Sequence, residues 1–101
     1  MKIELKIQDR IILSNLMPKQ NSFERLVLQN DIIEKIKWSY ESLVNVGFNA
    51  EMQTIDTAKD LAVEFEFSES EVLFVSNLLK DISAKNELLI EAIQLYKAFV
   101  N

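Results

Sequence analysis

Apolar residues recur at helical spacing near the start of the chain. Ile12 and Leu16, like Leu13 and Met17, lie four positions apart, so they stack on successive turns and predict a first helix over residues 8–17. Pro18 disfavours helical geometry at the residue before it, so this helix is expected to end there.

A second helix is predicted after a polar loop at residues 18–21. Asn21, with Glu24 three positions later, has the spacing of a capping box. The helix is expected to break at residues 29–31, because Asn and Asp side chains compete for backbone hydrogen bonds. Its predicted buried stripe consists of Phe23, Leu26, Val27, Ile33 and Ile36, flanked by Leu28 and Ile32.

The middle of the chain changes from helical to strand spacing. Ser39 is expected to cap a third helix that runs to Val46, with Gly47 just beyond its end. Residues 61–67 then alternate, which predicts a half-buried strand. Residues 51–55 are its expected partner and residues 2–7 a candidate third strand. The inward set is Leu61, Val63, Phe65 and Phe67, and the outward set is Ala62, Glu64 and Glu66.

Two helices are predicted in the last third. Ser68 and Glu71 form a second capping box, which opens a helix over residues 69–84. Asn86 is expected to cap a last helix over residues 87–100, and the short connection predicts an antiparallel helical hairpin. The expected core face of the first of these helices carries Val72, Val75, Leu79 and Ile82.

These elements predict one globular domain over residues 1–101. The fold class is α+β and mainly helical, with about five helices and a small antiparallel β-hairpin or three-stranded sheet. The first two thirds follow the element order of a winged helix, although the third helix carries no Lys or Arg with which to read DNA.

The composition excludes much of the usual chemistry. The 101 residues include no Cys and no His, which removes thiolate nucleophiles, zinc sites and the commonest near-neutral base. A single glycine does not build a phosphate-binding loop. We therefore expect no catalytic residues, no cofactor and no metal, and the chain is predicted not to be an enzyme. A hydrolase acting through carboxylates is the least favoured alternative.

Location and nucleic-acid binding follow from hydropathy and charge. The longest apolar run is four residues, at 72–75, and the first seven residues alternate charged and apolar, so we expect no membrane span, no secretory signal and a cytoplasmic protein. The net charge is −5, divided into +1 over residues 1–50 and −6 over residues 51–101. A polyanion would be repelled by the second half, so no nucleic acid is expected as a partner.

Two features are candidates for a protein-interaction surface. Acidic residues gather where the predicted strand meets the following helix, although such charges also protect strand edges and favour helix starts. The last helix is apolar almost all round, so it is either the centre of the core or covered by another chain. Trp38 is expected to be a core residue, with interface anchoring as the alternative. The candidate surface comprises Glu64, Glu66, Glu69, Glu71, Leu89, Ile93 and Tyr96.

Short segments of the chain are similar to a known group of proteins. They are LMPK at residues 16–19, the Ser68-Glu69 step after the strand, and LYKAFV at residues 95–100. These segments resemble small uncharacterised phage and prophage proteins of gut Bacteroidetes, in which "LLPKEG" occurs early and "LYEKFV" near the end. The resemblance implies a phage or prophage origin, hence the host cytoplasm as location. It assigns no functional residue, because no activity is established for the group.

The sequence therefore favours a non-enzymatic protein–protein interaction module with an unidentified protein partner. The alternative is a homodimer with a structural or assembly role, in which the last helix forms the seam.

Overall fold

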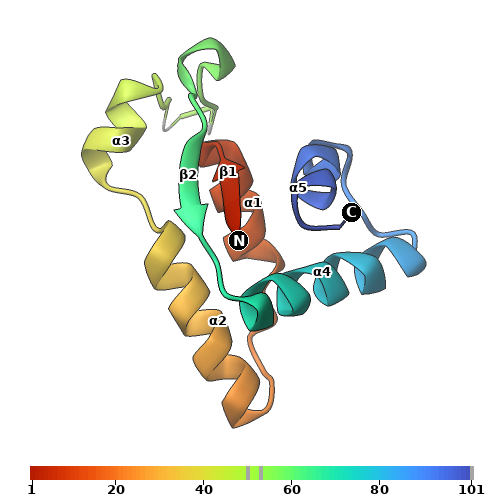
Figure 1. The fold of residues 1–101 in the computed structure, drawn as a ribbon. Coiled ribbons are helices and arrows are strands. Elements are labelled where there is room, and N and C mark those ends of the chain that lie inside the picture. Colours follow the sequence, from red (N-terminus) through yellow and green to blue (C-terminus); the bar gives the residue numbers. More distant parts are fainter. Residues whose placement is uncertain (50, 53, 101) are drawn as a thin grey trace.

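A computed structural model describes residues 1–49, 51–52 and 54–100 (Figure 1). They form five α-helices and a two-stranded antiparallel sheet, which confirms the predicted mainly helical α+β class. The strands are β1 (Lys2–Leu5) and β2 (Val63–Glu66). The helices are α1 (Ile7–Leu16), α2 (Phe23–Ile36), α3 (Tyr40–Asn45), α4 (Glu69–Ala84) and α5 (Ile93–Phe99), with 3-10 turns η1 (Thr57–Lys59) and η2 (Ile90–Ala92).

The sheet joins two segments that are distant in the sequence. In it, Ile3 lies opposite Phe65 and Leu5 opposite Val63, so β1 confirms the candidate strand at residues 2–7 as far as Leu5, while Ile7 already begins α1. The predicted pairing of β2 with residues 51–55 is wrong, and the winged-helix order fails with it. Glu51 and Met52 instead form a turn on the side chain of Asn49. Residues 50 and 53, the second of which falls within that predicted strand, lie outside the described residues.

The core lies beneath the sheet, where α1, the C-terminal half of α2, α4 and α5 meet. Phe67 follows β2 into this core and packs edge-to-face against Phe99, with 5.4 Å between ring centroids. Leu61 and Val63, predicted to point inward with Phe67, are exposed instead. The buried cluster consists of Ile3, Leu5, Leu13, Met17, Ile32, Ile36, Phe67, Val75, Leu79, Leu95 and Phe99.

Two buried polar side chains fix α1 in place. The carboxylate of Asp60 accepts hydrogen bonds from the backbone N–H groups of Ile7 and Gln8, at 2.8 and 3.0 Å. Arg10 donates hydrogen bonds to the carbonyls of Ile36 and Lys37, both at 2.7 Å. These carbonyls lie at the C-terminal end of α2, where they have no partner within the helix. Burial lowers the pKa of Arg10, while the charge of Asp60 opposes that shift.

The start of α2 differs from the prediction. Ser22, not Asn21, is the N-cap, and its hydroxyl accepts from the Arg25 N–H at 3.3 Å. Asn21 instead donates to the side chain of Gln29, which in turn donates to the carbonyl of Pro18 at 2.9 Å. Gln29 is buried in these bonds, and α2 runs unbroken through residues 29–31, so the predicted break there is wrong.

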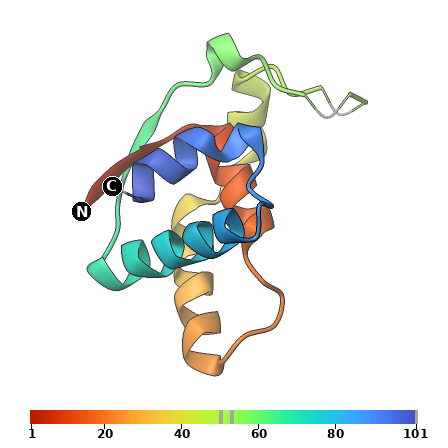
Figure 2. The same cartoon turned by 90° about the vertical axis from the view of Figure 1, so that its right-hand side faces the viewer.

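The buried face of α2 also differs from the predicted stripe. Ile32 and Ile36 are fully buried, whereas Phe23 is 81% exposed and Val27 45% exposed. Leu26 is exposed as well. In Figures 1 and 2 the N-terminal half of α2 projects beyond α4 at the lower end of the molecule, so little of the chain is there to cover this face.

Helices α3 and α4 confirm their predictions. Ser39 caps α3. Gly47 follows the end of this helix with a φ of +66°, a backbone conformation that would be strained in a residue with a side chain. Ser68 and Glu71 form the predicted capping box, and α4 covers residues 69–84 as expected.

The last helix is shorter than predicted. Asn86 does not cap it, because its φ of +58° places it in the left-handed conformation that ends α4. Residues 87–89 are not helical, η2 follows, and only Ile93–Phe99 form an α-helix. In Figure 2, α4 and α5 run in roughly opposite directions, as the predicted hairpin requires.

Candidate protein-binding surfaces

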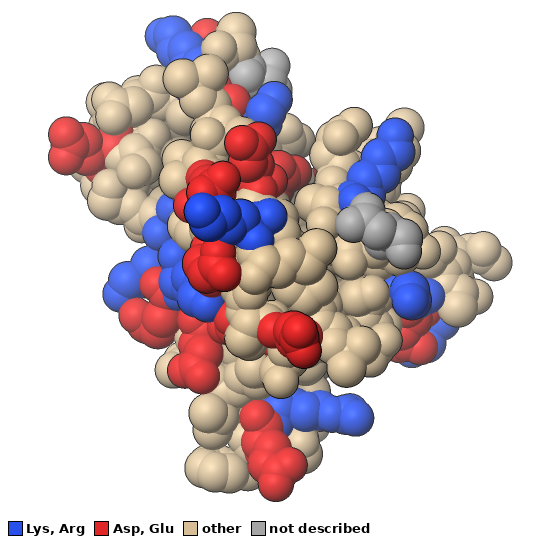
Figure 3. All heavy atoms as spheres, viewed as in Figure 1, with Lys and Arg blue, Asp and Glu red and all other residues tan. Residues whose placement is uncertain are grey.

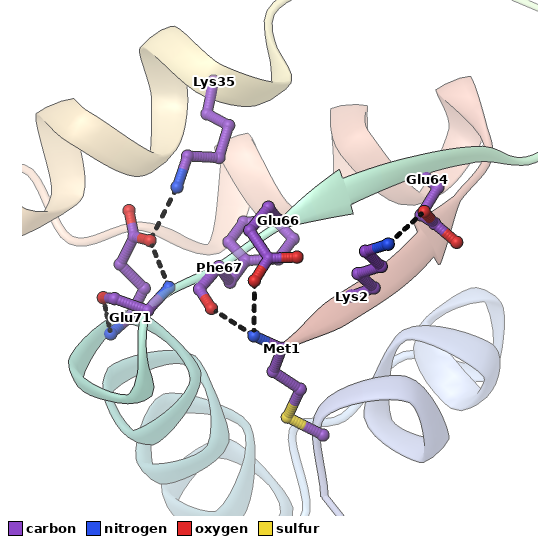
Figure 4. A network of polar contacts seen from close by, with 8 residues as sticks. Met1, Lys2, Lys35, Glu64, Glu66, Phe67 and Glu71 are labelled. Atoms are coloured by element: carbon purple, nitrogen blue, oxygen red, sulfur yellow. Dashed lines mark hydrogen bonds and ion pairs between the residues drawn. The ribbon is translucent and has the colours of Figure 1, made fainter.

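Charged side chains of both signs cover the outer face of the sheet. Glu4 lies directly opposite Glu64, and Lys2 opposite Glu66. Lys2 also reaches Glu64 at 3.8 Å, while the amino group of Met1 reaches Glu66 at 3.0 Å (Figure 4). Figure 3 shows acidic and basic side chains interleaved over this region. Exposed pairs of this kind contribute about 0–1 kcal/mol each, but they partly neutralise the acidic surface.

Glu71 does not belong to a surface, which corrects the predicted acidic row. It is 5% exposed, accepts from the Ser68 N–H at 2.8 Å and forms an ion pair with Lys35 at 2.7 Å (Figure 4). Burial by itself would raise the pKa of this carboxyl, but the hydrogen bonds from Lys35 and Ser68 outweigh it and lower the pKa. Glu71 therefore joins α4 to α2, and Glu64, Glu66 and Glu69 remain exposed.

The candidate residues near the C-terminus are divided between core and surface. Tyr96 is partly buried against the core, while Leu89 and Ile93 are exposed. Ile90, in η2 beside them, is 77% exposed. Part of the apolar surface predicted for the last helix therefore faces outward. Its exposed residues are Leu89, Ile90 and Ile93, which we call the C-terminal apolar patch.

Trp38 lies in the connection between α2 and α3 and is half-buried. No residue of α3 is buried, and Tyr40 at its start is 82% exposed. Trp38 is therefore neither a fully buried core residue nor a fully exposed one.

One exposed apolar surface was not predicted. It lies on α2 and consists of Phe23, Leu26 and Val27, which we call the outer face of α2. Phe23 and Ile32 are nine residues apart, as are Val27 and Ile36, and nine steps of about 100° place the members of each pair on opposite sides of a helix. α2 is therefore apolar on two sides, one of them buried in the core and the other exposed.

Two carboxylates border the outer face of α2 along one side. Glu24 and Asp31, which we call the acidic flank, are seven residues apart, are exposed, and form no ion pair among the described residues. The nearest cation along that side, Lys35, is engaged by Glu71. The acidic flank is thus uncompensated within the described part of the chain.

A hollow of about 600 Å³ lies on another side of α2. Arg25 lines it together with Asp81 and Lys85 of α4, which pair at 3.2 Å. Its apolar lining comes from Leu16, Phe74, Leu78 and Ile82.

The described residues contain no group of three carboxylates placed to hold a metal ion. Every buried side-chain nitrogen and oxygen among them has a hydrogen-bond partner. No helix in this part of the chain has the length and apolar character needed to cross a membrane.

No family model, curated protein or solved structure matches the chain.

Proposed function

We propose that this chain is a non-enzymatic protein-binding module that contacts its partner through the outer face of α2. The observation that carries the proposal is the presence of apolar residues on two opposite sides of one helix. A helix of this kind is typical of a buried position, yet the chain itself covers only one side. Covering Phe23 and Val27 would contribute about 3 kcal/mol, a useful share of a protein–protein affinity.

The buried polar groups support a binding function over an enzymatic one. Asp60, Arg10 and Glu71 are each engaged in contacts that fix helix ends, and none of them lines the hollow beside α2. We also propose, from the resemblance, that the module is of phage or prophage origin and acts in the cytoplasm of the host cell.

A photo-reactive residue placed at Val27 tests the proposal in the cell that makes the protein. Benzoylphenylalanine at this position should give a cross-linked product larger than the chain, because Val27 would lie against the partner. The same residue at Lys80, exposed on α4, is the matched control and should leave the chain uncross-linked. Equal products from both positions, or none from Val27 in a folded protein, would overturn the proposed function.

The second candidate function is a homodimer with an assembly role. It is favoured by the patch of Leu89, Ile90 and Ile93, which faces outward beside α5. Light scattering after size exclusion, at low and high salt, should then give twice the chain mass under both conditions. Ile90→Asp would produce a folded monomer, whereas a monomeric wild type would exclude this candidate.

A further inference from the structure

We infer that the outer face of α2 binds an amphipathic helix that carries Lys or Arg beside its own apolar stripe. This inference rests on the proposed function, because it names the chemistry of the partner for the same surface.

The shape of the outer face favours a helix as the occupant. Phe23, Leu26 and Val27 have the i, i+3, i+4 spacing with which two helices interlock their side chains. The outer face extends from Phe23 to Val27, about 6 Å along the helix axis, and the acidic flank beside it continues to Asp31. This half of α2 projects beyond α4 (Figures 1 and 2), which leaves room for a second helix beside it.

The charge beside the outer face favours a basic occupant. Glu24 and Asp31 lie on the same flank, about 10.5 Å apart along the axis. The cations of α2 and its end are engaged elsewhere: Lys35, on the same side, pairs with Glu71, Lys37 pairs with Glu34 at 2.8 Å, and Arg25 lines the hollow. Lys or Arg at two positions seven residues apart on the partner would meet both carboxylates.

The same charges disfavour a second copy of this chain as the occupant. In an antiparallel two-fold pairing of α2 with itself, each acidic flank would meet the acidic flank of the other copy. In a parallel pairing the flank would meet the side that carries Leu26, which leaves Glu24 and Asp31 without a counter-charge. A basic helix neutralises them in either direction.

Two labelled peptides of roughly 18 residues provide the test, since shorter helices are marginal in water. Both carry Leu at helical spacing; one has Lys beside the Leu stripe and the other has Glu. By fluorescence anisotropy we expect the Lys peptide to bind the protein at least about tenfold more tightly than the Glu peptide. Phe23→Ser/Val27→Ser should abolish binding, and Glu24→Gln/Asp31→Asn should remove the preference for Lys.

Two matched variants separate this site from general effects. Glu64→Gln/Glu66→Gln removes the same number of charges from the sheet, and Leu73→Ser/Ile90→Ser removes exposed apolar side chains from other elements. Both should leave affinity for the Lys peptide within about twofold of the wild type. An equal loss in the sheet variant would mean that the peptide binds the overall negative field, which overturns the inference.

Other outcomes overturn the inference and leave the proposed function standing. Equal affinity for the Lys and Glu peptides, lost in Phe23→Ser/Val27→Ser, would show an apolar site without charge selection. Binding of neither peptide, with a cross-link from Val27 to another protein in cells, would show a partner of different chemistry. A cross-linked product of twice the chain mass would identify a second copy as the occupant.

Discussion

Helices α2 and α4 are the two longest in the molecule, and both begin at a serine N-cap. They differ in the distribution of their apolar side chains. In α4 the buried Val75 and Leu79 lie on the face that the sequence predicts, and Val72 beside them is partly buried. In α2 the exposed Phe23 and Val27 satisfy helical spacing as well as the buried Ile32 and Ile36 do. Periodicity therefore identifies a helix reliably, but it identifies the buried face only when a single face is apolar.

The largest expected effect on stability comes from the buried side of α2. Ile36→Ala should lower the free energy of unfolding by about 3 kcal/mol, because it removes buried atoms and leaves a cavity. Leu79→Ala in α4 should cost a similar amount, since Leu79 is equally buried. Urea unfolding followed by circular dichroism measures both. If Ile36→Ala cost less than about 1 kcal/mol, the inner side of α2 would not be part of the core.

The ion pair between the two helices gives the next effect. Glu71→Gln keeps a side chain suited to the capping box but removes the charge that pairs with Lys35, so we expect a loss of about 2 kcal/mol. Glu69→Gln is the control: it removes an exposed charge from the same helix turn and should cost about 0.5 kcal/mol. Equal losses would mean that only the helix dipole matters at this position.

The same ion pair predicts a pH dependence with a definite sign. Because folding lowers the pKa of Glu71, the folded state binds fewer protons, and the stabilisation is present above the ordinary pKa that this carboxyl has in the unfolded chain. It is lost as the pH falls through the lowered pKa of the folded state. The difference in unfolding free energy between wild type and Glu71→Gln should therefore be constant from about pH 7 to 5 and shrink below about pH 4. A difference that grows in acid would contradict the lowered pKa.

The sequence predicted local features better than distant contacts. The serine caps at Ser39 and Ser68 and the ends of α4 depend on residues within a few positions of each other, and all were predicted correctly. The partner of β2 depends on which strand brings the better apolar face, and β1, more than fifty residues earlier, supplies the buried Ile3 and Leu5. No local pattern contains that information.

The candidate surface also depends on contacts between residues that are distant in the sequence. Glu71 was predicted to lie on an acidic surface because it belongs to a run of carboxylates from Glu64 onward, and only the fold brings Lys35 within 2.7 Å of it. The outer face of α2 was taken for core because its spacing is that of a core stripe. The two-sided apolar pattern was visible in the sequence, as pairs of residues nine positions apart. With apolar residues on two opposite sides, only one side of α2 fits into the core of the chain.

The smallest expected effect on stability is the most informative about function. Phe23→Ser should change the free energy of unfolding by no more than about 0.5 kcal/mol, because the side chain is 81% exposed and touches little of the core. Beside the large cost expected for Ile36→Ala, a near-zero cost would show that an aromatic residue at the start of α2 contributes little to folding. Urea unfolding of the two variants under the same conditions gives this comparison directly. A loss above about 1.5 kcal/mol for Phe23→Ser would mean that the chain itself covers the outer face of α2, which would leave no surface there for a partner.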